Sequence, residues 1–534
     1  MRKSTSFITF LLAGMIWLVP GSVAAGNISS DLAARLARMR ADEMVDVLVY
    51  FTDQLDAKQF SLPQKEVLTA GEKRIRINKA LRSKAVQAQA KLKQLLLKNK
   101  ARNLRSFWIV NGLAATVPVA AIQQIASQPG VARVSIDGKV KLPETTIASA
   151  TADVAWNINL TLAPQLWKQG YDGSGIVIGI VDTGVDMEHQ DLQARWRGGS
   201  NSWYDPNGEH LTPYDPDGHG TQVAGILVGG DVSGSAIGMA PGARWIAVKI
   251  FDDAGNASYS DIHLGFQWLL DPDNDPVTDD APQLVNNSWG LNGLVGQCIT
   301  EFQPDIQLLQ ASGIAVNFSA GNGGPNTGTS ISPANYPESF AVGGIDAALL
   351  VTDFSSRGPS ACGGAVYPAL VAPAVDIRTA DLTFGGLFPD SYATVSGTSF
   401  AVPHITGAMA LLKNARPWIT AADLRQVLTL SADDLEAPGP DNDSGYGLVN
   451  VVQALNLLDS HTCTDASGHF YFNSEGCDGG GQPGFKAIAP IMHLLLGRMI
   501  PNRHGAGSFL SSVPGNSSSP WLTPTHEVSY ESTI

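Results

Sequence analysis

The alternation of apolar runs and helical stretches between about residues 150 and 457 limits the fold of this chain more than any other feature of its sequence. Apolar runs that read as buried strands lie at 175–182, 243–251, 283–290, 313–322 and 339–346. Stretches with helical spacing lie at 261–270, 305–312 and 399–415. Buried strands separated by helices are typical of a parallel sheet that is covered on both faces. The functional site of such a sheet is expected at the carboxyl ends of its strands.

Three polar residues stand where that site is expected. Asp182 ends the first apolar run in IVDTGVD, His219 lies at a glycine-flanked helix start in DGHGTQVAG, and Ser399 opens a helix in SGTSFAVPH. Together they supply an orienting carboxylate, a general base and a nucleophile. Taken singly, Ser399 could cap its helix, and the other two could be buried structural residues.

His404, five residues after Ser399, is not the expected base. Five helical residues turn the chain by about 500°, which leaves the two side chains about 140° apart on the helix. We therefore expect His404 to be a packed structural histidine.

The motifs IVDTGVD, DGHGTQVAG and SGTSFAVPH, in this order, resemble the three signature blocks of the subtilisin-like serine peptidases (subtilases). SAGN and SSRGPS resemble two further blocks, and NSWYDPNGEH, NNSWG and SPANYPESFAVGG resemble the bacillopeptidase F-like branch. The resemblance covers about residues 150–457. It implies an α/β fold, namely a subtilisin-like three-layer domain with a mostly parallel sheet at 146–457. It also implies a secreted serine endopeptidase that cleaves protein or peptide substrates through an acyl-enzyme.

The resemblance further implies roles for individual residues. Asp182 would orient His219, His219 would take the proton of Ser399, and Ser399 would attack the peptide carbonyl. Asn322 in SAGN would donate to the oxyanion, although an asparagine between two glycines also tolerates left-handed backbone geometry. Substrate binding is implied for Ser288, Trp289, Gly290, Ala320, Gly321 and Ile331. We expect Ile331 to shorten the primary specificity pocket and to favour small or medium-sized apolar side chains.

Two departures from the family pattern lie near the predicted site. Gln222 stands where the family carries a second histidine, and Phe400 and Val402 are bulkier than the usual residues. Gln222 lies three residues after the predicted base and is not expected to belong to the triad, so catalysis should survive.

The first 145 residues differ from the rest of the chain. Residues 1–25 have the basic start, the apolar run and the small-residue cleavage site of a signal peptide, which predicts secretion. Residues 26–145 carry strand patterns at 45–51, 112–118 and 131–137 and a helical pattern at 120–128. In this order they resemble the small α+β inhibitory propeptide of subtilases. The propeptide would be an intramolecular inhibitor and chaperone, cleaved off between Lys139 and Ala150.

Residues 65–105 read as a long polar helix or helix pair that carries 13 Lys/Arg and 2 Glu, whereas the whole chain has a net charge of −14. The simplest interpretation is a solvated helix face. The more specific interpretation is that this basic segment docks on an acidic part of the same chain. Nucleic-acid binding is not expected, because removing the +11 of this stretch leaves −25, which would repel phosphate.

Four cysteines allow three disulfide pairings in a secreted protein. Proximity in sequence favours Cys463–Cys477, which would leave Cys298–Cys362, although the sequence does not settle the choice.

Calcium is the one cofactor that the sequence suggests, in a structural role rather than in the chemistry. Asp191 in HQDL aligns with a carboxylate that ligates calcium in many subtilases, and the nearby loop 230–238 supplies Asp231. The insertion DPDNDPVTDD at 271–280 alternates acids that suit a hard cation, although acidic loops are more often merely solvated.

Residues 458–534 form a Gly-rich C-terminal tail. Its apolar segment 485–500 resembles a bacterial sorting tail that attaches a chain to the cell envelope, but sixteen residues are short for a membrane span. An anchor, a peripheral helix and a disordered tail all remain open, and membrane contact is expected nowhere else.

Two other functions fit parts of the pattern. GTSFA nearly meets the GxSxG motif of α/β-hydrolases, but in those esterases the histidine follows the serine, whereas His219 precedes Ser399. A binding protein on an inactive peptidase scaffold is disfavoured because all four predicted catalytic residues are present.

Overall fold

The computed structural model of this 534-residue chain describes residues 26–61, 68–143, 146–148, 156–435, 438–465 and 468–477. The predicted signal peptide at 1–25 and the predicted sorting segment at 485–500 lie outside the described residues. Among the described residues, no helix combines the length and the apolar character that crossing a membrane requires.

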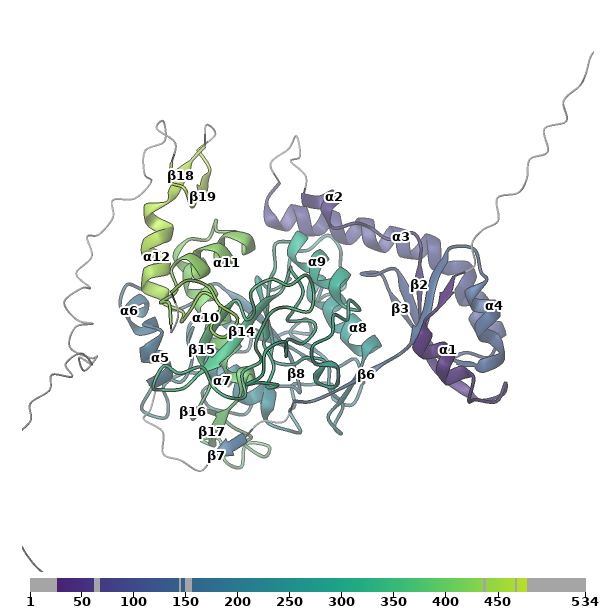
Figure 1. Ribbon diagram of the computed structural model, residues 1–534, viewed down its shortest axis with the longest axis horizontal. Helices are drawn as coiled ribbons and strands as arrows, with labels where there is room; N and C mark the ends of the chain where they lie inside the picture. Colours follow the sequence, from purple (N-terminus) through teal and green to yellow (C-terminus); the bar gives the residue numbers. More distant parts are fainter. Residues whose placement is uncertain are drawn as a thin grey trace, which may run out of the picture. The chain divides into compact units, whose positions relative to one another are not determined.

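A seven-stranded sheet forms the centre of the larger domain (Figure 1). Its strand order is β15-β14-β13-β12-β8-β10-β9, and all neighbouring pairs run parallel. The strands are β8 (Val177–Asp182), β9 (Trp203–Tyr204), β10 (Arg244–Lys249), β12 (Leu284–Asn287), β13 (Ala315–Ser319), β14 (Phe340–Ile345) and β15 (Leu370–Pro373). The predicted parallel sheet is therefore confirmed.

Helices cover both faces of this sheet. On β12, Asn286 bonds to Thr406 of α10 (Thr398–Ala415), whereas its neighbour Val285 packs in one cluster with residues of α8 (Tyr259–Leu270) and α9 (Gln303–Ala311). Adjacent residues of a strand point to opposite faces, so α10 and the α8–α9 pair lie on opposite sides and make three layers. The remaining helices of this domain are α5 (Trp156–Leu160), α6 (Ala163–Trp167), α7 (His219–Val228), α11 (Ala421–Leu430) and α12 (Val451–Ser460).

Three smaller sheets complete the larger domain. In one of them β17 (Tyr392–Ser396) pairs antiparallel with β16 (Ile377–Ala380) and with β7 (Thr146–Ala148). In the second, β11 (Asn256–Ser258) pairs antiparallel with β6 (Lys139–Lys141). The third consists of β18 (Thr462–Thr464) and β19 (Phe470–Phe472).

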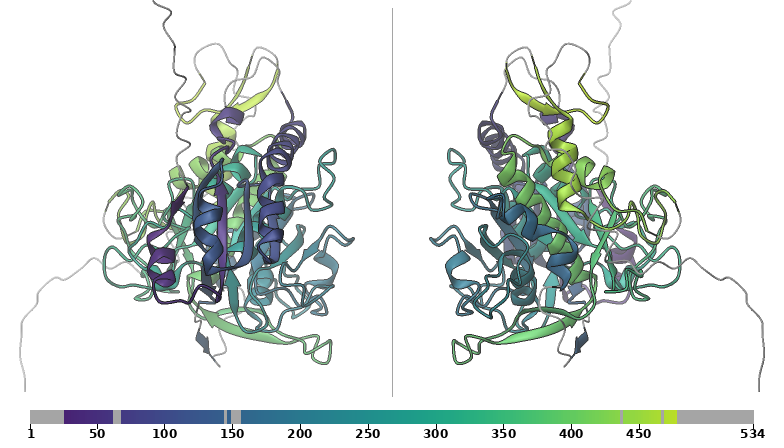
Figure 2. Two further views of the ribbon diagram at one scale, coloured as in Figure 1. Left: turned by 90° about the vertical axis from the view of Figure 1, so that its right-hand side faces the viewer. Right: turned by 90° about the vertical axis from the view of Figure 1, so that its left-hand side faces the viewer.

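The N-terminal domain is a five-stranded sheet with helices on one face (Figure 2). Its strand order is β1-β5-β2-β4-β3. Val47 and Val49 of β2 pack in a cluster with Leu92 and Leu96, whereas Leu48 packs in the cluster that holds α8 and α9. The other face of the sheet therefore lies on the larger domain. The elements are β1 (Asn27–Ile28), α1 (Ser30–Leu36), β2 (Met44–Phe51), α2 (Lys58–Ser61), α3 (Ala70–Lys98), β3 (Arg102–Phe107), β4 (Gly112–Pro118), α4 (Ile122–Ala126) and β5 (Val131–Ile136).

In the basic stretch 65–105, the described residues 68–105 contain one long helix followed by a strand, which corrects the prediction of helix up to residue 105. Helix α3 stops because Lys100 has a φ of 59°, and Ala101 N–H donates to Leu96 O at 3.0 Å, as in a Schellman cap. The following strand β3 was missed because RNLRSF lacks the apolar alternation of a strand, and only Phe107 in it is buried.

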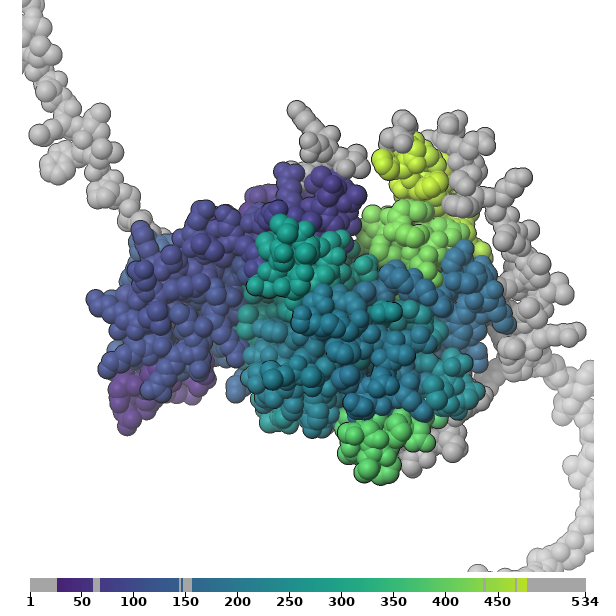
Figure 3. All heavy atoms as spheres, turned by 180° about the vertical axis from the view of Figure 1, so that it is seen from behind, coloured from purple at the N-terminus to yellow at the C-terminus, as the bar shows by residue number. Residues whose placement is uncertain are grey.

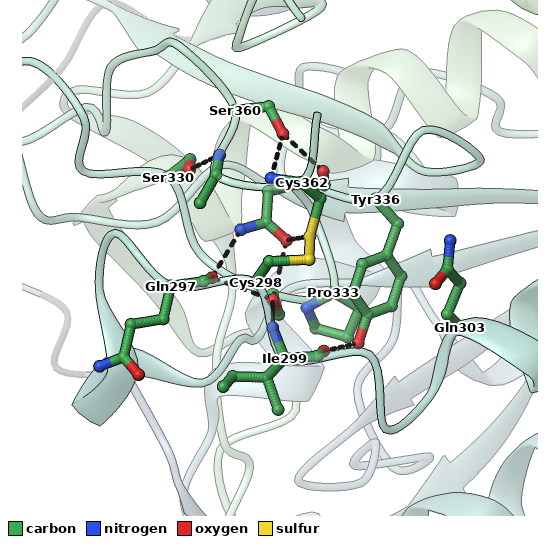
Figure 4. Close-up of a disulfide and its surroundings, with 12 residues drawn as sticks. Gln297, Cys298, Ile299, Gln303, Ser330, Pro333, Tyr336, Ser360 and Cys362 are labelled. Carbon is green, nitrogen blue, oxygen red and sulfur yellow. Dashed lines mark hydrogen bonds between the residues drawn. A yellow bond between two sulfur atoms is a disulfide. The ribbon is translucent and has the colours of Figure 1, made fainter. Parts of the chain in front are cut away.

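Both disulfides follow the pairing that proximity favoured, Cys298–Cys362 and Cys463–Cys477. Figure 4 shows the first of them and its surroundings. Asn335 Nδ2 donates to Gln297 O at 3.0 Å, and Ile299 N–H donates to Ser332 Oγ at 2.9 Å. This bridge and its hydrogen bonds brace the loop on which Ile331 lies.

Candidate active site

Asp182 and His219 meet at the carboxyl end of the central sheet. Asp182 is the last residue of β8, and His219 is the first residue of α7, after Gly218 with its φ of 103°. His219 Nδ1 lies 2.6 Å from Asp182 Oδ1, and both side chains are almost fully buried. Within the described residues His219 Nε2 has no hydrogen-bond partner. The pair therefore presents an oriented imidazole whose second nitrogen is free to accept a proton.

The pKa of His219 is raised above its ordinary value. Burial alone would lower this pKa, but the Asp182 carboxylate beside the ring, with Asp217 and Asp215 behind it, favours the imidazolium. Asp215 was not predicted from the sequence. Its buried carboxylate accepts from Thr221 N–H and from Gly218 N–H, at 2.9 and 3.0 Å, and so holds the start of α7. The position of Asp215, four residues before His219 in the sequence, could have indicated this role.

Ser399 is the second residue of α10 and is 1% exposed. Its hydroxyl donates to Ser288 O at 2.9 Å, and Ser288 Oγ donates back to Ser399 O at 2.8 Å. The hydroxyl proton of Ser399 therefore points to a backbone carbonyl in this structure rather than to His219. His404, farther along the same helix, bonds to Phe400 O and to Asn157, and burial lowers its pKa to about 4. These contacts agree with a structural histidine.

Asn322 follows β13 and is held by the residue before Ser399. Its Oδ1 accepts from Thr398 N–H at 3.0 Å and from Thr398 Oγ1 at 2.8 Å. Because two donors fix the oxygen end, the Nδ2 amide is left as the donating end, and the residue lines a cleft. An amide held in this way has a fixed donor at the cleft, and fixed donors are the groups that stabilise an oxyanion.

Two glycines and Ile331 define the predicted specificity pocket. A Cβ on Gly290 would lie 2.3 Å from Ile331 Cδ1, and a Cβ on Gly321 would lie 2.6 Å from the same atom. Gly321 also has a φ of 98°. The end of the Ile331 side chain therefore fills the space that the two glycines leave open.

The other predicted pocket residues contribute backbone rather than side chains. The Trp289 indole is fully buried among Phe266, Phe302 and Phe318, with ring centroids 5.9–6.3 Å away. Ala320 is buried, and its carbonyl accepts from the hydroxyl of Tyr367.

The two departures from the family pattern are both packed near the pair. The Phe400 ring lies 5.6 Å from the His219 ring, centroid to centroid. Gln222 Nε2 donates to Asp381 Oδ1 at 3.1 Å, and its backbone carbonyl accepts from Thr379. Gln222 thus ties α7 to β16 and to Asp381 directly after it rather than to His219.

A cleft of about 850 Å³ adjoins these residues, and part of the N-terminal region forms one of its walls. Its lining includes Asn322, Ile331 and residues 291–295 on one side and residues 139–143 on the other. Strand β6 pairs antiparallel with β11 and buries Val140, and β7 resumes beside β17 with Thr146 opposite Ser396, three residues before Ser399. The chain therefore lines the cleft at 139–143 and lies beside the strand that leads to Ser399 at 146–148.

Asp191, which was predicted to bind calcium, already has donors. Asp191 Oδ1 accepts from Val232 N–H at 2.9 Å, and Asp191 Oδ2 accepts from the Tyr392 hydroxyl at 2.6 Å. Two acidic groups within the described residues bring ligand atoms within 4.8 Å of one another, Glu209–His210–Asp253 and Asp271–Asp273–Asp280. The Lys249 ammonium contacts both carboxylates of the first group at 2.9 Å, and Arg82 contacts Asp271 of the second group at 2.5 Å.

A buried charged cluster between the two domains was not predicted. His263 Nδ1 contacts Asp305 at 3.0 Å, and Glu301 bonds to Arg133 at 2.8 Å and to the Tyr50 hydroxyl. Burial acts against both charges, yet Asp305 and Glu301 raise the pKa of His263 to about 10, and His263 and Arg133 lower the pKa of Glu301 to about 2. The cluster therefore carries charges of both signs at the domain interface.

Comparison with known proteins agrees with this geometry. A profile of the Subtilase family matches residues 173–447. Bacillopeptidase F of Bacillus subtilis (strain 168) is 34% identical over 396 residues, 68% of this chain and 27% of that protein. Subtilisin E of Bacillus subtilis (strain 168) is 32% identical over 374 residues, 69% of this chain and 87% of that protein. Alkaline elastase YaB of Bacillus sp. (strain YaB) is 30% identical over 352 residues, 66% of this chain and 81% of that protein.

Proposed function

Because the chain belongs to the subtilase family of serine endopeptidases, we propose that it is a secreted zymogen whose triad is Asp182, His219 and Ser399. The observation that carries the proposal is the buried imidazole of His219, oriented by Asp182 and with an unpartnered Nε2. The Ser399 hydroxyl leaves Ser288 O, gives its proton to this nitrogen and attacks the peptide carbonyl carbon.

The other residues then act on the charge that this attack creates. Asp182 stabilises the imidazolium, and the Asn322 amide donates to the oxyanion, a contact that stabilises the transition state by about 2.7–4 kcal/mol. The imidazolium then protonates the leaving amine, and an acyl-enzyme on Ser399 remains for water to hydrolyse. Ile331 limits the side chain before the scissile bond to small or medium-sized apolar residues.

Residues 26–145 act as an inhibitory propeptide, with a signal peptide before them and the catalytic domain at 146–457. The lining of the cleft by residues 139–143 supports this assignment, because a segment in this position excludes substrate. Cleavage between Lys139 and Ala150 by the chain's own Ser399 opens the cleft.

Intact mass spectrometry of the secreted protein tests both claims. Wild type should lose about 115–125 N-terminal residues after signal removal, because cleavage falls between Lys139 and Ala150, while Ser399→Ala should keep them, because it lacks the nucleophile. The same spectra report how much of the tail 458–534 is kept, and so whether it serves as a sorting segment. Two full-length proteins, with no hydrolysis of casein by wild type, would instead support the inactive-scaffold interpretation.

Bound calcium has a structural role. The insertion 271–280 is a better calcium site than Asp191. Hard cations take six to eight oxygen ligands, and Asp271, Asp273 and Asp280 offer carboxylates close together. Arg82 occupies Asp271 in the full chain, so the cation site belongs to the mature enzyme. Calcium should raise the melting temperature of mature wild type but not of Asp273→Asn; equal shifts would place the ion elsewhere.

A further inference from the structure

One face of helix α3 lies on the acidic insertion of the larger domain. Arg74 donates through Nε and Nη2 to the two oxygens of Asp279, at 2.6 and 2.9 Å. Asn78 Nδ2 donates to Leu270 O at 2.9 Å, and Arg82 Nη2 donates to Asp271 at 2.5 Å. The three α3 residues are spaced by four, which places them on one stripe of the helix. The basic segment is thus docked within the same chain rather than only solvated.

The ion pairs across this interface all run in one direction. Among the described residues, every ion pair between the two domains puts an arginine on the N-terminal domain and a carboxylate on the larger one: Arg74–Asp279, Arg82–Asp271, Arg105–Asp261 and Arg133–Glu301. The two domains form this interface through residues drawn purple to blue on one side and teal on the other (Figure 3). We call Asp261, Asp271, Asp279 and Glu301 the arginine-binding face.

The carboxylates of this face are more deeply buried than most of their partners. The side chains of Asp271, Asp261 and Glu301 are 1%, 6% and 7% exposed, against 23%, 32% and 41% for Arg82, Arg105 and Arg133. Once the N-terminal domain leaves, Asp261, Asp271 and Asp279 lose their arginine partners together, whereas Glu301 keeps His263. At Asp271 an arginine then competes with the calcium ion proposed above. A cluster of like charges without partners attracts the same kind of cation again.

The face is connected to the cleft by one helix. Strand β11, which pairs with the segment in the cleft, runs directly into α8, whose first turn carries Asp261. Asp271 follows the last residue of the same helix. Twelve helical residues span about 18 Å, a distance that about six extended residues cover. One polypeptide can therefore bind the face and still reach the cleft.

We propose that in the mature enzyme the arginine-binding face docks helices of protein substrates that carry arginines eight residues apart. The inference rests on the proposed function, since it requires release of the N-terminal domain. Docking raises the local concentration of the substrate at the cleft. The enzyme therefore cleaves a basic helical protein faster than another protein with the same sequence around the scissile bond.

The test uses mature wild-type enzyme and three probes. The first is a short fluorogenic peptide, the second is that peptide joined by a flexible ten-residue linker to residues 69–100, and the third carries Arg74→Gln and Arg82→Gln in the same helix. We expect kcat/KM of the second probe to exceed that of the third by about tenfold. The difference should vanish at 1 M salt, where the Debye length is about 3 Å.

Enzyme variants locate the effect on the face. The preference for the second probe should be lost in Asp271→Asn and in Asp279→Asn but kept in the matched control Asp353→Asn, an exposed carboxylate outside the face. Asp279, 36% exposed, keeps the test valid should Asp271→Asn fail to fold. Fluorescence anisotropy of labelled residues 69–100 gives binding without hydrolysis.

The measurements distinguish failure of the docking proposal from failure of the proposed function. Equal cleavage of the second and third probes, with normal hydrolysis of the short peptide, would overturn the docking proposal and leave the proposed function intact. No hydrolysis of the short peptide would overturn the proposed function, and anisotropy would still decide whether the face binds the helix.

Discussion

Shortening Ile331 should widen the range of side chains accepted before the scissile bond. Its Cδ1 is the atom nearest to both Gly290 and Gly321, so Ile331→Val removes the atom that fills the pocket, and Ile331→Ala removes three carbons. Each buried carbon of a substrate that fills this space contributes about 0.8 kcal/mol. The preference for Phe over Ala should therefore rise about fourfold in Ile331→Val and about 60-fold in Ile331→Ala.

The assay compares kcat/KM for two peptides that differ only in that residue, because the ratio is unaffected by the amount of active enzyme. Ile331 is 1% exposed, so Ile331→Ala also lowers the free energy of unfolding, by about 2–5 kcal/mol. Ile314→Val, a buried residue of the same hydrophobic cluster, is the control for packing loss and should leave the ratio unchanged. An unchanged ratio in folded Ile331→Ala would show that another residue closes the pocket.

Three further predictions concern charge. Asn322→Ala should lower kcat by about 10²–10³ with little change in KM, measured on a short peptide; a loss confined to KM would contradict the oxyanion role. The acid limb of kcat/KM against pH should lie above about 6.5, because the raised pKa of His219 keeps the base protonated at lower pH, and a limb below that value would contradict it. Glu301, with its pKa lowered to about 2, stabilises the Ser399→Ala precursor above about pH 4.3, and this stabilisation is lost as pH falls toward 2. Thermal melting should show that loss in the precursor and not in a Glu301→Gln version of it.

The parallel sheet could be predicted from the sequence because its strands are buried on both faces and read as continuous apolar runs. β8, β10, β12, β13 and β14 all fell within predicted runs. The pattern failed where a strand is polar or very short, as in β3 and β9, and it also missed the buried four-residue strand β15. Such strands are specified by their partners in the sheet, which a local window does not contain.

The candidate site was predictable in its residue types but not in its hydrogen bonds. Motif and order pointed to Asp182, His219 and Ser399, yet nothing in SGTSFAVPH indicates that the Ser399 hydroxyl donates to Ser288 O. The basic segment at 65–105 is a similar case. Its charge suggested an acidic partner, but Asp271 lies 189 residues after Arg82, and only the fold brings the two together.

The interface also bears on how the N-terminal domain would be released after cleavage. Strand β6 pairs with β11 over only three residues, and such a short pairing is marginal by itself. The four arginine–carboxylate pairs and the hydrophobic cluster around Leu48 do not depend on the bond that is cut. We therefore expect cleavage and release to be separate steps, with a cleaved complex that persists at low ionic strength. Gel filtration should show the two fragments together at about 50 mM salt and apart at about 1 M, where the partly exposed ion pairs are screened. Coelution at both concentrations would mean that apolar packing, and not the ion pairs, holds the cleaved domain in place.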